Sequence, residues 1–186
     1  MTNIYLPGLK GTEYDGYFDG IPNWFSSATP TGNTELRSNF SPVDPPPSNG
    51  FSWEWTGYFK PLSAEGFIED DFTFAMNSDD LGIMWIGAPA VAGFDTSNKL
   101  VSAFGYDQSD PVSLRADTFY PVRIQFGHPV PPTAVGLYIQ ANPTKRMAND
   151  FVSGCLFHSI LGGNSGKVTQ ITGKTKIHGC KVKIKI

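Results

Sequence analysis

The chain has 186 residues, 40% of them hydrophobic and 13% aromatic, which suits one globular domain and excludes a disordered chain. Charged residues make up only 17%, beside 20 glycines and 15 prolines. Because long solvated helices need Glu, Lys and Arg, this composition argues against a helical protein and favours a loop-rich all-β domain.

Charge is unevenly distributed along the chain. The net charge is −3, but residues 167–186 contain six lysines and no carboxylate, so the rest has eight basic residues against 17 acidic ones. An acidic body disfavours nucleic acid, which needs basic surface. Residues 1–8 lack the basic and apolar regions of a secretory signal, and no stretch approaches the length of a membrane span. We therefore expect neither nucleic acid nor a membrane as partner.

Strand-like runs recur at short intervals, with turn residues between them. In the clearest run, Phe51, Trp53 and Trp55 alternate with polar residues. The other runs are 71–76, 83–86, 120–126, 135–139 and 151–157. Their spacing predicts an antiparallel β-sandwich or a closed barrel. The segment from Ser26 to Gly50 is rich in Pro, Ser, Thr and Asn and is expected to be an irregular surface excursion.

Two adjacent carboxylates, Asp79 and Asp80, follow the strand-like run that ends at Met76. We expect the strand to end at this pair. Successive strand residues point to opposite faces, so one carboxylate would be forced inward unless a cation lies between the two. Ca2+ is the natural candidate, because it takes oxygen ligands from loops. The alternative is that the pair only begins a solvated turn, a common use of Asp before Gly.

Aromatic residues divide by their local pattern. Those within strand-like runs are expected in the core, with Cys155 as a small core residue; they are Trp53, Trp55, Trp85, Phe74 and Phe126. Trp24 and Phe25 lie in a turn-rich stretch, and Tyr106 lies beside Asp107 in a predicted loop. These residues are the candidates for an exposed surface on which a sugar could stack.

The C-terminal part differs from the rest. We expect residues 1–161 to form the sandwich, the glycine-rich segment 162–166 to be a hinge, and residues 167–186 to form an extended basic β-arm. Such an arm can bury little alone, so it needs the edge of a partner sheet. The predicted contacts with neighbouring subunits are Lys174, Lys176, Lys181, Lys183 and Lys185.

An enzyme is not expected. Adjacent aspartates are too close to serve as the separated acid and base of a glycosidase, whose carboxyls stand ~5 Å or more apart. The three histidines, His128, His158 and His178, have neither metal-ligand nor catalytic-triad spacing. Phosphate-binding and dinucleotide-binding fingerprints are also absent from the sequence.

Five sequence segments, in the same order along the chain, resemble the PA14 superfamily, and most closely its GLEYA and flocculin-type branch of yeast cell-wall adhesins. They are Gly8–Gly11 with Tyr14 and Tyr17, Phe51–Pro61, Phe72–Asp80, Tyr120–Phe126 and Asn149–Phe157. The resemblance spans residues 8 to about 160. It implies an all-β fold, an antiparallel PA14-like β-sandwich, to which this chain adds the C-terminal β-arm.

The resemblance also implies a ligand site. In flocculin-type members, two adjacent aspartates joined by a cis peptide bind Ca2+, which in turn holds sugar hydroxyls; Asp79 and Asp80 match these positions. A second loop supplies an Asn side chain and backbone carbonyls, and residues 127–132 match it. His128 stands where Asn is expected, and His is a poor Ca2+ ligand. The backbone oxygens of His128, Val130 and Pro132 are therefore the predicted contributions of this loop.

Two functions follow from these observations. One is a non-enzymatic, Ca2+-assisted carbohydrate-binding domain on a bacteriophage virion, with Asp79, Asp80, Trp24 and Tyr106 touching a host or cell-surface glycan. The other is a purely structural virion subunit that uses the sandwich as a scaffold and residues 167–186 as a connector to other subunits. The initial Met and the lack of an export signal favour a virion protein, whereas a processed chain would be extracellular.

Overall fold

The computed structural model describes residues 3–40, 50–65, 69–129, 137–143, 155–161 and 176–178, and nearly all of its regular structure is β. The strands are β1 (Asn3–Pro7), β2 (Leu9–Asp15), β3 (Pro30–Arg37), β4 (Phe51–Phe59), β5 (Glu69–Ile86), β6 (Val101–Gln108), β7 (Val112–Arg115), β8 (Tyr120–His128), β9 (Leu137–Pro143), β10 (Leu156–Leu161) and β11 (Lys176–His178). Short helical turns are η1 (Pro22–Ser26), η2 (Ser63–Glu65) and α1 (Ala88–Val91). No helix in these ranges is long and apolar enough to cross a bilayer.

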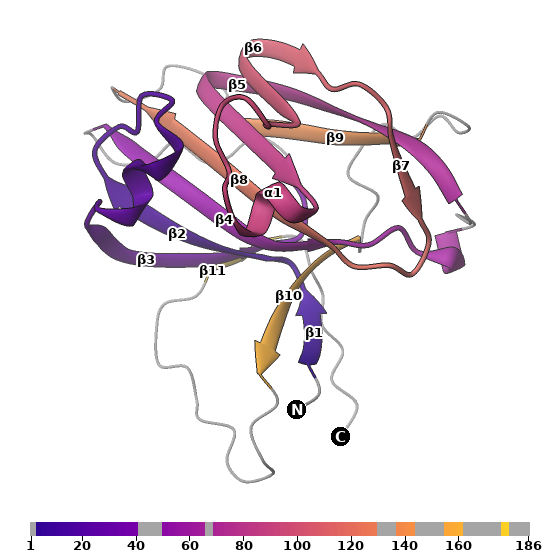
Figure 1. The fold of residues 1–186 in the computed structure, drawn as a ribbon. Helices are drawn as coiled ribbons and strands as arrows, with labels where there is room; N and C mark the ends of the chain where they lie inside the picture. The colour runs from indigo at the N-terminus through magenta and orange to yellow at the C-terminus, as the bar shows by residue number, and fades with distance from the viewer. Residues whose placement is uncertain are drawn as a thin grey trace, which may run out of the picture.

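The strands form two packed layers, as predicted for an antiparallel sandwich. One path of hydrogen-bonded neighbours runs β11-β3-β2-β4-β8-β5-β6, and β7 and β9 also pair with β5. β10 pairs with both β1 and β4, and Figure 1 shows β1 and β10 projecting together below the body. The pairs are antiparallel except for β11 with β3.

The long strand β5 joins the two layers. Its first half pairs with β9 from Phe72 to Ser78, and its second half pairs with β8 from Leu81 to Ile86. The prediction that the strand ends at Asp79 and Asp80 is therefore wrong. Pairing resumes at Leu81. The segment beyond it is buried on both faces, so it lacks the polar–apolar alternation from which a continuing strand could be predicted.

The main core lies between the two layers. Trp55 and Phe74 are fully buried in it, Phe126 is 1% exposed, and Cys155 lies in the same cluster, as predicted. Trp53 is only partly buried and stacks on Trp55, with 5.5 Å between ring centroids.

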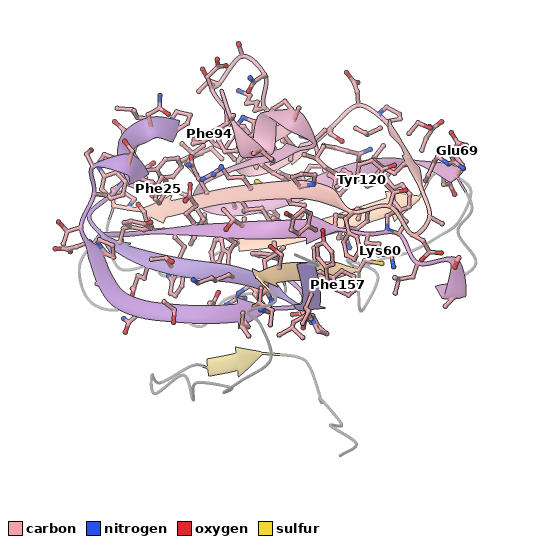
Figure 2. All side chains as sticks on the ribbon, turned by 60° about the horizontal axis from the view of Figure 1, so that its bottom comes forward. Phe25, Lys60, Glu69, Phe94, Tyr120 and Phe157 are labelled. Atoms are coloured by element: carbon pink, nitrogen blue, oxygen red, sulfur yellow. The ribbon has the colours of Figure 1, made fainter. Side chains whose placement is uncertain are left out.

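A second cluster covers the outer face of β5 and β8, beneath η1 and α1. It consists of Phe18, Phe25, Ile83, Trp85 and Ala90, with Phe94 packed against it. Figure 2 labels Phe25 and Phe94 of this group. Phe25 is thus a buried residue, not part of an exposed stacking surface, because η1 turns its ring toward Phe18.

The expected irregular excursion between Ser26 and Gly50 is wrong in part, because β3 lies within it. β3 pairs with β2 along residues 30–37. It lacks apolar alternation because both of its buried side chains, Glu35 and Arg37, are charged and neutralise each other at 2.6 Å. Residues 41–49 lie outside the described residues.

The C-terminal arm is described only at residues 176–178. There β11 pairs in parallel with residues 35–37 of β3, on an edge of this chain's own sheet. The predicted hinge at 162–166 and four of the predicted contact lysines, Lys174, Lys181, Lys183 and Lys185, lie outside the described residues. The division into sandwich, hinge and arm, and the contact role of Lys176, stay predictions.

Candidate functional site: a carboxylate pair facing a buried histidine

The carboxylate pair lies where β5 passes from one layer to the other. In the ladder with β6, Ser78 pairs with Gly105 and Leu81 pairs with Phe104, so the ladder steps over Asp79 and Asp80. The two residues form a bulge, a feature that re-aims side chains away from normal strand alternation. The peptide bond between them is cis, as the resemblance implied.

Both carboxylates face the side chain of His128, the last residue of β8. Its Nε2 atom lies 3.8 Å from Oδ1 of Asp79 and 3.8 Å from Oδ2 of Asp80. The Asp79 side chain is 45% exposed, that of Asp80 17% and that of His128 6%. The site therefore has an open carboxylate on one side and a buried imidazole on the other.

Strand pairing determines the position of His128. It is opposite Phe51, the first residue of β4, and the two rings are stacked with 4° between their planes. The sequence predicted a role for the backbone oxygen of His128, whereas the structure turns the imidazole toward the aspartates. Val130 and Pro132, the other predicted backbone ligands, lie outside the described residues.

The loop between β2 and η1 borders the same site. Burial raises the pKa of the Tyr17 hydroxyl above its ordinary value of 10, and the carboxylates of Asp80 and Asp19 raise it further. The loop is held by Ser52, whose hydroxyl accepts from the Phe18 N–H at 3.0 Å and donates to the Gly16 carbonyl at 2.9 Å. In the sequence, Tyr17 was only one of the residues that carry the family resemblance, and no sequence pattern predicted its position beside Asp80.

Two exposed aromatic rings flank the bulge on the neighbouring strand β6. Phe104 is opposite Leu81 and is 77% exposed, and Tyr106 is opposite Asn77 and is 67% exposed. Tyr106 was predicted from its position, although it lies in a strand and not in a loop. Phe104 was missed, and the aromatic–glycine–aromatic order of residues 104–106 is the signal that marks both rings.

Trp24, the other predicted stacking residue, is held by aromatic packing. It belongs to η1, is partly buried, and packs edge-on against Tyr14 and Phe25. This packing places Trp24 at the second hydrophobic cluster and not in the group that Asp79, Asp80 and His128 form, and its predicted contact with a sugar stays a prediction. The predicted residues that the structure does bring together are Asp79, Asp80 and His128, with Tyr106 on the adjacent strand.

The group formed by Asp79, Asp80 and His128 could hold a metal ion, since one ligand atom from each lies within 4.8 Å of the others. The carboxylates suit any hard or borderline divalent cation. The imidazole does not suit Ca2+, which takes oxygen ligands. The donor set therefore fits a divalent cation, but not the oxygen-only shell that Ca2+ prefers.

The chain is similar to known proteins over the segment that contains this site. Residues 51–141 match the family model of the GLEYA domain. No curated protein matches the sequence significantly.

Several solved structures share the fold. The A domain of epithelial adhesin 6 from Candida glabrata, in complex with Galβ1-3GlcNAc, gives a TM-score of 0.60 at 18% identity over 85% of this chain and 89% of that one. The PA14 domain of the antifreeze protein MpAFP gives 0.57 at 10% identity, over 90% of this chain and 97% of that one. A PA14 sugar-binding domain from an RTX adhesin gives 0.52 at 13% identity, over 78% and 94%.

Identities this low show a shared fold alone. Together with the match of residues 51–141 to the GLEYA family model, this shared fold agrees with the resemblance to the PA14 superfamily and its GLEYA branch that the five sequence motifs indicated.

Proposed function

We propose that this chain is a non-catalytic carbohydrate-binding domain whose glycan site lies at Asp79 and Asp80. The observation that carries the proposal is the convergence of both carboxylates on one point at an open edge of the fold. Phe104 and Tyr106 border this point with exposed rings, which suit the apolar face of a sugar.

The similar structures support this class of ligand. The adhesin 6 domain is in complex with Galβ1-3GlcNAc, and the RTX adhesin domain is described as sugar-binding. A galactose-containing disaccharide is therefore the first ligand to try. The bulged position of the carboxylates, beside the exposed rings of Phe104 and Tyr106, supports the same location for the site.

A divalent cation at the pair would supply open coordination positions for sugar hydroxyls. Asp79 and Asp80 would hold it, and Tyr17 and Asp19 would border it. Ca2+ is the ion implied by the resemblance, and the carboxylates alone suit it. Because His128 is an unusual neighbour for Ca2+, the test below treats the identity of the cation as a separate variable.

The test is glycan binding measured on an array that includes Galβ1-3GlcNAc, with the metal-stripped protein and with each divalent cation added back. The proposal expects binding that disappears on chelation and in the D79N/D80N variant. The matched control is D71N/D110N, which removes two exposed carboxylates elsewhere on the fold and should leave binding unchanged. Equal binding by the wild type and D79N/D80N would rule out this site.

The virion setting is part of the proposal and rests on the sequence alone. In it, the domain is carried on a bacteriophage particle and the lysine-rich residues 167–186 contact other subunits. If the array is blank under every cation, the structural alternative remains, with the sandwich as a scaffold and the arm as a connector. Deleting residues 167–186 and measuring assembly tests the arm independently of the glycan site.

A further inference from the structure

We propose that the site formed by Asp79, Asp80 and His128 selects a borderline first-row divalent ion, with Zn2+ as the test case, over Ca2+. The proposal shares its location with the proposed glycan site but does not depend on glycan binding. It starts from the third donor of the site, which is an imidazole nitrogen and not an oxygen. Zn2+ readily combines imidazole and carboxylate ligands, whereas Ca2+ takes oxygens.

The position of His128 makes the imidazole a fixed part of the site. Its side chain is 94% buried, since only 6% is exposed, and its ring is stacked in parallel on the buried ring of Phe51. A ring packed in this way cannot readily swing out and leave an oxygen-only site. A cation at the two carboxylates therefore meets the imidazole in its existing orientation.

The distances agree with one small ion. Each of the two carboxylate oxygens lies 3.8 Å from Nε2. Two ligands of one Zn2+, each at about 2.1 Å, can be no more than about 4.2 Å apart. The full set lies within 4.8 Å, so a slight closing of the carboxylates completes the shell. Asp79 can supply this movement because 45% of its side chain is exposed.

Three protein ligands leave a Zn2+ site open for a further ligand. Zinc sites with three protein donors keep a position for water or another oxygen donor. The exposed edge at Asp79 is the side from which such a ligand would enter. Zinc selection is thus compatible with glycan binding at the same place, without being required by it.

The test is thermal melting of the metal-stripped full chain in the presence of Zn2+, Mn2+, Ca2+ or Mg2+. With Zn2+ at a hundredfold excess over its Kd, we expect the Tm to rise by about 5–10 °C. Ca2+ at the same concentration should give a smaller shift. The H128N variant, which replaces the nitrogen donor by an amide oxygen, should lose the Zn2+ shift and keep or increase the Ca2+ shift.

Two controls separate this site from other zinc ligands. H158N changes a second buried histidine, whose Nδ1 lies 2.9 Å from the Gly8 carbonyl oxygen, and it should keep the zinc shift. His178 and Cys180 are two residues apart in the sequence and are themselves typical zinc ligands. All melts are therefore repeated in the H178N/C180S background, in which the zinc shift should remain.

The proposal is overturned if Ca2+ stabilises the wild type as much as Zn2+ does, or if the zinc shift survives in H128N. It is also overturned if no cation changes the Tm. Should H128N not fold, the NMR resonances of the His128 ring decide: zinc should shift them selectively and Ca2+ should not. None of these measurements requires a glycan, so they test the zinc proposal separately from the proposed function. Glycan binding that survives chelation would contradict only the cation dependence of the proposed function.

Discussion

The indole Nε1 of Trp55 donates a 2.6 Å hydrogen bond to Oε1 of Glu35, with both side chains inside the fold. The same carboxylate accepts from Nε and Nη2 of Arg37, at 2.6 and 3.1 Å. The Arg37 guanidinium in turn lies 5.6 Å from the centroid of the Phe40 ring. This charged cluster connects β3 to the core strand β4, and each of its charges has a partner.

The R37M variant should be strongly destabilised. It leaves the carboxylate of Glu35 buried without its cation, which costs about 3–5 kcal/mol in other proteins. The free energy of unfolding, measured in urea, should fall by that amount. The control is K60M, since Lys60 pairs with Asp117 at 3.4 Å on the surface and such pairs contribute about 1 kcal/mol or less. Similar losses in the two variants would contradict this account of the buried cluster.

Acid should remove the stabilising effect of Asp117. A hydrogen bond from the Ser63 hydroxyl, helped by Lys60, holds the pKa of the Asp117 carboxyl below its ordinary value of 3.8. A carboxyl whose pKa is lowered by folding stabilises the fold above the unfolded pKa, and this contribution is lost as the pH falls through the folded pKa. D117N should therefore be less stable than the wild type at pH 6, with the difference vanishing toward pH 2.

This substitution isolates the charge. Asp117 has a φ of 59°, a conformation that Asn tolerates as well as Asp does. Urea melts of both proteins across the pH range give the measurement. A difference that is constant with pH would assign the effect to something other than ionisation of this carboxyl.

The exposed rings of β6 should matter for glycan binding and not for stability. Phe104 and Tyr106 are mostly exposed, so F104A and Y106A should change the free energy of unfolding by about 0.5 kcal/mol or less. If they form the stacking shelf, each should weaken glycan binding about tenfold, as central aromatic contacts do. V91A removes another exposed apolar side chain, 63% exposed, and should leave affinity unchanged. Unchanged affinity in both aromatic variants would place the sugar elsewhere.

Much of the fold could be predicted from the sequence, because apolar and polar residues alternate in strands that have one solvent-exposed face. The alternation of Phe51, Trp53 and Trp55 identified β4, and the aspartate pair identified the centre of the candidate site. The second half of β5 was harder, since burial on both faces leaves no alternation to mark where the strand continues. β3 was hidden for the opposite reason, because its buried side chains include Glu35 and Arg37.

The orientation of the His128 side chain could not be predicted, for a physical reason. Sequence reasoning put the backbone of His128 near the aspartates, since an imidazole is a poor ligand for the expected Ca2+. The register of strand pairing determines which atoms of a residue face its neighbours. His128 pairs with Phe51 in the folded sheet, and the sequence alone does not show this pairing. The positions of Tyr17 and Asp19 could not be predicted from the sequence either, because a contact with Ser52 holds their loop in place.

That loop provides the last prediction, at Gly127 beneath it. A Cβ added at Gly127 would lie 2.7 Å from Cδ1 of Phe18 and 2.8 Å from the hydroxyl of Ser52. G127A should therefore push the loop outward and cost about 1–3 kcal/mol of stability through overpacking. Because the same loop places Tyr17 beside Asp80, glycan affinity should fall as well.

G57A is the matched control, since its Cβ would lie 2.3 Å from the carbonyl oxygen of Phe157, at the β4–β10 contact away from the site. Both variants should lower the midpoint of urea unfolding, because neither close contact can be relieved without moving the backbone or a packed ring. Only G127A should reduce glycan affinity when the two are compared at a temperature where both remain folded. If G57A weakens binding equally, the loss in G127A comes from general destabilisation, and the loop at residues 16–20 has no specific role in shaping the site.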